Sequence, residues 1–312
     1  MANMTATEPR ASASKPTRVP RRPTESRAAG EGRPLGRSII LIGLSLYFLL
    51  PIWWLLVAST KSMSGLFNGS AGPLWFDKNF DLWGNLAQLS AHGGGIYWRW
   101  LGNSFLYATA GGIGATVLAV LAGYGFAKYS FKGRPAAFSM LLGAVMVPTT
   151  ALVLPTFVLF SAVGLTNTIW AVILPSIMTP FGVYLLRIYA QDAIPDELMD
   201  AARIDGAGEL RIFLTVALPL LKPAITTVLL LGVVGTWNNY FLPLALLSDP
   251  KLYPVTVGLD QWLTQSALAG GGQQLWNLVV VGALVSIIPL VIVFLAMQRY
   301  WQAGLSLGSV KA

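Results

Sequence analysis

The sequence has no cysteine and a single histidine. Without cysteine there can be no disulfides, no thiol catalysis and no thiolate metal site. His92 lies in the stretch Ala-His-Gly-Gly-Gly, and a single loop histidine of this kind is more typical of a solvated side chain than of a metal ligand or proton relay. Neither thiol nor histidine chemistry is therefore expected to define the function of this chain.

Charge is also scarce, and one long segment lacks it altogether. From Pro135 to Leu186 there are 52 residues without Asp, Glu, Lys or Arg. As an α-helix at about 1.5 Å per residue this run would measure ~78 Å, more than twice a ~30 Å hydrocarbon core. It must therefore cross a membrane twice, and the sequence Gly-Leu-Thr-Asn-Thr at 164–168 predicts the turn, because Gly and Asn tolerate positive φ.

With 54% hydrophobic and 11% charged residues, the composition predicts an all-α integral membrane protein with six transmembrane helices. Helices are expected because backbone polar groups must be paired inside lipid. The predicted spans are 38–60, 102–127, 136–163, 167–186, 223–247 and 276–298. Residues 1–37, rich in Pro, Ser, Ala and Arg, are predicted to form a disordered basic tail. External loops are expected at 61–101 and 248–275, and a polar loop at 187–222.

Basic residues predict the orientation. Seventeen of the 21 Lys and Arg fall in the two tails and in the loops after the second and fourth spans, whereas four fall in the opposite loops. This bias places both termini and the loop 187–222 in the cytoplasm. The formal charge of +8 therefore indicates topology, and no nucleic-acid partner is expected.

Two further patterns predict packing. Trp98-Arg99-Trp100, just before the second span, is typical of an interfacial anchor, with a substrate contact as the alternative. Within that span, small residues recur every four positions and predict a face on which another helix approaches closely. These residues are Gly111, Ala115, Ala119, Gly123 and Ala127.

The loop 187–222 is the most informative segment. Pro195 suits the start of a helix, and acidic residues follow it where the helix dipole favours negative charge. Leu198, Ala201 and Ala202 fall on one apolar side of low relief. Gly206 breaks the helix, and a second helix is expected from Glu209 to Leu218. Such an element between two spans predicts a docking surface for a partner in water.

The same residues carry a resemblance. Asp200-Ala201-Ala202, Gly206, Val216 and Leu218-Pro219 resemble the EAA loop of ABC-type importer permeases, whose pattern is Glu-Ala-Ala, Gly and Ile-x-Leu-Pro at this spacing. Asp and Val replace the usual Glu and Ile, both conservatively. The resemblance covers about residues 38–312. Asn103-Ser104, residues 122–127, residues 237–243 and the C-terminal residues from Gln298 to Lys311 are similar to the carbohydrate-uptake branch, in particular the maltose-type short permease subunit.

This resemblance implies a type I ABC importer permease, a non-catalytic subunit of the bacterial plasma membrane. It implies as partners a second permease in a heterodimer, two cytoplasmic ATPase subunits and an extracytoplasmic solute-binding protein. The coupling residues it implies are Asp200, Ala201, Ala202, Asp205, Gly206, Leu218 and Pro219. It also implies that the loop 248–275 reaches toward the binding protein. The chain has no Gly-x-x-x-x-Gly-Lys-Ser/Thr loop, so no cofactor is expected on it, and ATP-Mg belongs to the ATPase partner.

A candidate substrate pathway lies in the fifth predicted span. Trp237, Asn238, Asn239 and Tyr240 supply hydrogen-bonding groups and aromatic faces in one turn, as a sugar requires. The alternative is that an asparagine pairs with a neighbouring helix. At 100° between successive residues, at most one of the two asparagines is expected to face sugar.

Other functions remain open at this stage. The solute could be a polyol or a glycerol phosphate ester rather than a sugar. A secondary transporter is less favoured, because such proteins usually bury ionisable residues in their spans and none lies inside the six predicted here. A membrane enzyme would need a nucleophile, His cluster or carboxylate pair in a plausible site, which the sequence does not offer.

Overall fold

The computed structural model describes residues 35–69, 71–268 and 275–306. Within these ranges the chain forms helices and turns and no strand. The predicted disordered tail lies almost wholly outside them, as do residues 269–274 of the predicted external loop 248–275. The chain divides into two units, residues 1–50 and 51–312, and the described part of the first is the beginning of one helix.

The α-helices are, in chain order, α1 (Leu35–Ser59), α2 (Met63–Asn68), α3 (Leu82–Ala91), α4 (Ile96–Lys128), α5 (Arg134–Val145), α6 (Val153–Ala162), α7 (Trp170–Ser176), α8 (Pro180–Ala193), α9 (Asp196–Ile204), α10 (Glu209–Ile212), α11 (Leu218–Leu220), α12 (Lys222–Trp237), α13 (Phe241–Leu246), α14 (Val255–Leu268) and α15 (Trp276–Ser306). Short 3₁₀ turns are η1 (His92–Gly94), η2 (Thr149–Leu152) and η4 (Pro250–Leu252), and η3 (Phe213–Ala217) is a π-helical turn.

Four segments of the described chain are long and apolar enough to cross a membrane. They are Ser38–Ser59, Ile96–Lys128, Trp170–Ala193 and Trp276–Gln298. Two bent pairs meet the same criterion when each is taken as one span, Arg134–Val145 with Thr149–Ala162 and Glu209–Leu220 with Lys222–Trp237. The structure therefore offers four to six spans by length and composition.

The predicted third span, 136–163, is not one straight helix. Its two halves, α5 and α6, meet at 98°. Pro148 lies at the bend with φ −59° and ψ +128°, outside the helical region, and its ring and missing N–H favour a break in the helix there. The turn that follows has the predicted backbone, because Gly164 and Asn167 both have positive φ, +70° and +57°.

The predicted fifth span and the loop after it also differ from the expectation. Within 223–247, α12 ends at Trp237 and α13 begins at Phe241, so the candidate pathway residues Asn238, Asn239 and Tyr240 lie at or beside a helix break. Residues 248–275, predicted as a loop, contain the 14-residue helix α14. Hydrophobicity alone did not reveal it, because α14 is shorter than a span and carries polar residues.

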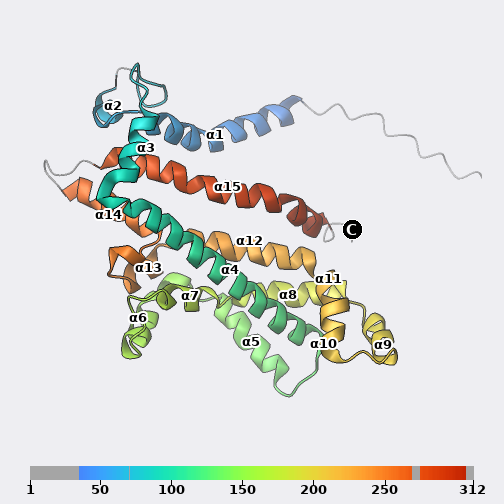
Figure 1. Ribbon diagram of the computed structural model, residues 1–312. Helices are drawn as coiled ribbons and strands as arrows, with labels where there is room; N and C mark the ends of the chain where they lie inside the picture. The colour runs from blue at the N-terminus through green and yellow to red at the C-terminus, as the bar shows by residue number, and fades with distance from the viewer. Residues whose placement is uncertain (1–34, 70, 269–274, 307–312) are drawn as a thin grey trace, which may run out of the picture. The chain divides into compact units, whose positions relative to one another are not determined.

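Helix α4 is the packing centre of residues 51–312. It lies along α12, α8 and α7 (Figure 1), and its small residues make this approach close. A Cβ at Gly123 would lie 2.6 Å from the Cβ of Leu186 of α8 and 3.0 Å from the backbone N of Arg187. Ala115 and Ala119 are 1% and 0% exposed, so the face predicted from the four-residue spacing is a packing face, and the neighbouring Gly112 extends it toward Gly232 of α12.

The expected anchor Trp98-Arg99-Trp100 was wrong for its last residue. The Trp100 side chain is 1% exposed, its ring centroid lies 4.7 Å from that of Trp262 on α14, and its indole N–H donates to the carbonyl of Pro250. Trp98 is exposed. Because α14 was not foreseen, no surface covering Trp100 was expected.

Candidate coupling site

The loop between α8 and α12 folds as two short helices joined by a tight turn. Pro195 precedes α9, and Asp196 and Glu197 occupy its first turn. The turn contains Gly206 at φ +81°, a conformation that side chains with a Cβ rarely adopt. α10 then leads through the π-helical turn η3 to α11. This is the predicted layout of helix, glycine break and second helix.

The inner side of this element is packed into the protein. Met199 of α9 and Ile212 of α10 are 2% and 0% exposed. They belong to a cluster of buried side chains that also includes Tyr124 of α4, Leu186 of α8 and Leu221. The two helices are therefore fixed on the ends of α4 and α8 by apolar packing, and do not hang free as a mobile loop.

A buried lysine fixes the start of α9. The ammonium of Lys128, the last residue of α4, donates to the carbonyl of Ile194 at 2.5 Å and to Asp196 Oδ1 at 2.7 Å. The Lys128 side chain is 6% exposed, whereas that of Asp196 is 81% exposed. Lys128 lowers the pKa of the Asp196 carboxyl through this hydrogen bond. The end of α4 thus holds the N-terminus of α9 by one carbonyl and one carboxylate.

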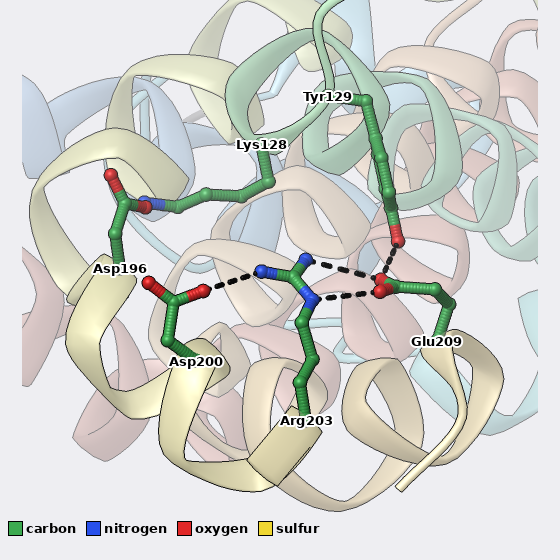
Figure 2. A network of polar contacts seen from close by, with 6 residues as sticks. All are labelled: Lys128, Tyr129, Asp196, Asp200, Arg203 and Glu209. Carbon is green, nitrogen blue, oxygen red and sulfur yellow. Dashed lines mark hydrogen bonds and ion pairs between the residues drawn. The ribbon is translucent and has the colours of Figure 1, made fainter. Parts of the chain in front are cut away.

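A second polar contact connects α4, α9 and α10 (Figure 2). The hydroxyl of Tyr129, directly after α4, donates to Glu209 Oε2 at 2.7 Å. Arg203 of α9 donates from Nε to Glu209 Oε1 at 2.8 Å. The same guanidinium donates from Nη1 to Asp200 Oδ1 at 2.8 Å. Arg203 therefore joins the two helices of the element, and Tyr129 joins both to α4.

The charges in this network are mutually stabilised. Glu209, and then Asp200, raise the pKa of the Arg203 guanidinium. Arg203, and then Tyr129, lower the pKa of the Glu209 carboxyl. Burial, followed by the bond to Glu209, raises the pKa of the Tyr129 hydroxyl. At neutral pH the ions are therefore charged and Tyr129 stays protonated as the donor.

The outer side of the element is apolar and is not covered by any residue in the described part of the chain. We call this set of exposed residues the docking face: Leu198, Ala201, Ile204, Leu210 and Leu214. Ile204 is 87% exposed and Leu210 is 72% exposed. Large apolar side chains this open, framed by charged residues, mark an interaction surface.

The predicted coupling residues are divided between these two sides. Ala201 and Asp205 are exposed, and Ala202 is half-buried against the core, so the expected common side of Leu198, Ala201 and Ala202 is shared between the docking face and the packed face. Asp200 pairs with Arg203. Gly206 makes the turn. Leu218 packs against the core from α11, and Pro219 beside it is exposed.

The four candidate pathway residues do not form one cluster of free polar groups. Trp237 is 6% exposed and its ring packs edge-on against Phe105 at 5.1 Å. The amide of Asn238 donates to the carbonyl of Val234 in its own helix. The Asn239 carbonyl accepts from the Thr256 hydroxyl.

Tyr240 completes this set with a contact to α14. Its hydroxyl donates to Asp260 Oδ2 on α14 at 2.8 Å. The helix break at 238–240 is therefore connected to α14 by Thr256 and Asp260, two residues that the sequence did not single out.

Sequence reasoning also missed the residues that hold α9 and α10, together called the docking element, in place. Lys128 was counted only as a topology signal, and Tyr129 and Glu209 carried no motif. Their partners lie 68 and 80 positions away in the chain. The available signal was a basic and a phenolic residue directly after a long span, facing a loop rich in acidic residues.

Comparison with known proteins agrees with this picture. The family described as binding-protein-dependent transport system inner membrane component matches residues 115–306. An arabinooligosaccharides transport system permease protein of Halalkalibacterium halodurans is 38% identical over 70% of this chain and 75% of its own length. A melibiose/raffinose/stachyose import permease protein of Bacillus subtilis is 34% identical over 72% and 82%.

Two further matches are more distant. An sn-glycerol-3-phosphate transport system permease protein of Pectobacterium atrosepticum is 29% identical over 86% of this chain and 93% of its own length. Among solved structures, a bacterial ABC transporter involved in the import of the acidic polysaccharide alginate has a chain of the same fold. The TM-score is 0.73 at 24% identity, covering 86% of this chain and 95% of that one.

Proposed function

We propose that this chain, which belongs to the binding-protein-dependent transport system inner membrane component family, is a permease subunit of an ATP-driven carbohydrate importer. As a member of this family it is a multi-pass membrane component that works with other ABC transporter components. The observation that carries the proposal is the docking face, an apolar surface held on the end of α4 by Lys128 and Tyr129.

In this proposal an ATPase subunit binds the docking face in the cytoplasm. Low-relief residues such as Ala201 let the partner approach, and Ile204 and Leu210 bury apolar area on binding. Because Tyr129 and Lys128 connect the element to α4, closure of the ATPases displaces α4 and α8 with it. Transport follows by alternating access, with ATP-Mg bound by the ATPase and not by this chain.

We propose six crossings and cytoplasmic termini, in which α5 with α6 forms one crossing and α12 with α13 forms another, so that α10 stays in the cytoplasm. The bias of 17 basic residues against four supports this orientation. The partners in the proposed assembly are a second permease, two ATPase subunits and an extracytoplasmic solute-binding protein. The carbohydrate uptake named for the relatives at 38% and 34% identity supports a sugar over the glycerol phosphate named for the relative at 29%.

Along the pathway, the break at 238–240 is the place where we propose that solute passes. Asn238 and Asn239 interrupt a helix that is otherwise apolar, and polar residues at such a depth carry a cost that function can explain. Trp237 supports the break from the buried side and does not face solute. Asn238→Leu is expected to slow uptake while leaving the ATPase subunits bound.

The test is purification of the tagged chain from its native membrane in a mild detergent, followed by mass spectrometry and reconstitution in liposomes with the co-purifying subunits and the binding protein. The expected result is an ATPase and a second permease, and ATP-dependent uptake of an arabinooligosaccharide or raffinose. Uptake of glycerol 3-phosphate alone would replace the sugar by a phosphate ester. Uptake by the isolated chain without ATP would overturn the proposal.

A further inference from the structure

The segment 71–80 folds back along the end of α1. The indole N–H of Trp53, in the last two turns of α1, donates to the carbonyl of Leu74 at 3.0 Å. The ring of Trp53 also packs against Trp75 and Phe76, with centroids 6.1 and 5.6 Å away. This part of the connection between α1 and α3 therefore lies against the side of the helix and not beyond its end.

The level of this contact follows from helix geometry. Trp53 precedes Ser59, the last residue of α1, by six positions, so its Cα lies about 9 Å below the helix end at 1.5 Å per residue. Helical side chains lean toward the N-terminus, which places the indole no nearer the end than its Cα. By contrast, Asp81 N donates to the carbonyl of Thr60, so the segment is level with the helix end again when α3 begins. Residues 74–76 are therefore the part of the segment that lies farthest along α1 from its Ser59 end.

Polar groups at the base of the segment are paired inside the protein. The Lys61 side chain is 3% exposed, lies 3.3 Å from Asp77 Oδ2 and donates to the carbonyl of Gly72 at 2.7 Å. Asp77 also accepts from the backbone N–H of Ala71. Pro73 has no N–H to satisfy. A segment that enters a bilayer needs its polar groups satisfied in this way.

Three side chains that the segment leaves open are large and apolar, and Lys78 and Asn79 are exposed beside them. Leu74 is 44% exposed, Trp75 is 63% exposed and Phe80 is 55% exposed. They continue the exposed apolar surface of the end of α1, on which Trp53 and Trp54 are 39% and 41% exposed. Tryptophan is enriched at the boundary between hydrocarbon and headgroups, where its ring is buried and its N–H finds a partner.

We propose that residues 73–80 form a lipid-contacting loop, which inserts Leu74 and Trp75 into the interfacial layer of the leaflet at the Ser59 end of α1. The bound partner is the phospholipid surface. The Lys61–Asp77 ion pair neutralises the charges at the base of the loop. The inserted loop then sets how far the α2–α3 region lies from the membrane. The inference needs only that α1 crosses the membrane, and it holds whichever side Ser59 faces.

The absence of cysteine permits a direct test in the assembled transporter. Trp75→Cys and Phe80→Cys, each labelled with bimane, are reconstituted in vesicles of phosphatidylcholine brominated either near the headgroup end or near the tail end of the acyl chain. Ala87→Cys, at an exposed position on α3, is the matched control. Iodide in the buffer reports access from water.

The expected result is a large loss of bimane fluorescence at position 75 with bromines near the headgroup end, a smaller loss with deep bromines and little quenching by iodide. Position 80 is expected to respond to shallow bromines to a smaller extent, and position 87 to iodide alone. If position 75 is quenched by iodide as strongly as position 87, the loop lies in water. If neither bromolipid nor iodide reaches positions 75 and 80, another protein covers them. Either outcome overturns the proposal.

Discussion

Tyr129 and Glu209, 80 positions apart in the sequence, are joined by a 2.7 Å hydrogen bond between the phenol and a carboxylate oxygen. Tyr129 directly follows α4, the helix against which α7, α8 and α12 pack. Glu209 begins α10 of the docking element. We therefore expect a displacement of α9 and α10 to be transmitted to α4 through this hydrogen bond.

Removal of the phenol hydroxyl is the first test of this connection. Tyr129→Phe keeps the ring contacts with Tyr124 and loses the bond to Glu209. We expect ATP hydrolysis by the assembled transporter to continue while solute uptake per ATP falls, because the element can move without α4. Tyr184→Phe is the control, since its ring stacks on Phe138 and its hydroxyl makes no hydrogen bond with any described residue. Equal uptake per ATP in both variants would contradict the connection.

Arg203 is predicted to hold α9 and α10 together. Arg203→Gln removes the cation that pairs with Asp200 and Glu209 and leaves two carboxylates near each other. Hydrogen exchange of residues 196–212 should become faster in the assembled transporter, and uptake should fall. Arg211→Gln removes an exposed cation of the same element for which no ion pair is found in the described structure. If both variants exchange alike, the network does not order the element.

The turn at Gly206 gives a matched pair of substitutions. A Cβ at Gly206 or at Gly208 meets no atom within 4 Å, but Gly206 has φ +81° and Gly208 has φ −72°. Gly206→Ala should therefore destabilise the turn by about 1–2 kcal/mol through backbone strain alone. Gly208→Ala should leave it unchanged. Limited proteolysis of the element in the purified transporter measures the difference, and equal cleavage of the two variants would exclude strain as the role of this glycine.

Acidification should weaken the contacts of Glu209 with Arg203 and Tyr129, and so loosen the docking element, over a defined pH range. Because Arg203 and Tyr129 lower the pKa of Glu209 from its ordinary value of 4.5, the folded state favours the charged form. The stabilisation is complete above the ordinary pKa and is lost as pH falls through the lowered pKa of the folded state. Exchange protection of residues 196–212, corrected for intrinsic rates, should decline only in that acidic range. Glu209→Gln should lack this part of the decline, and an unchanged profile would contradict the prediction.

The membrane class, the packing face of α4 and the layout of the docking element followed from local sequence. The uncharged run, the four-residue spacing and the position of Gly206 can each be read from one continuous stretch of the sequence. The bend at Pro148 and the break at 238–240 were harder to foresee, because hydropathy does not distinguish a straight span from two short helices of the same composition.

The motif residues of the site were predicted from the sequence, but the residues that hold the docking element on α4 were not. Asp200 and Gly206 stood out because their spacing resembles a known loop. Lys128 and Tyr129 did not, since the bonds that give them a role depend on where α9 and α10 lie in space. The prediction that Trp100 is an interfacial anchor was wrong for the same reason. Its packing partner, Trp262, belongs to a helix that the local sequence pattern did not reveal.

The central claim is that the docking face binds a cytoplasmic ATPase, and single-cysteine crosslinking tests it most directly. Ala201→Cys is placed in the docking face and Ala87→Cys on α3 serves as the control, both in the otherwise cysteine-free chain and in native membranes. After treatment with a short bifunctional thiol–amine reagent, we expect position 201 to give an adduct with the ATPase subunit and position 87 to give none. An assembled transporter in which position 201 reacts with no ATPase, or in which position 87 does so equally well, would contradict the account.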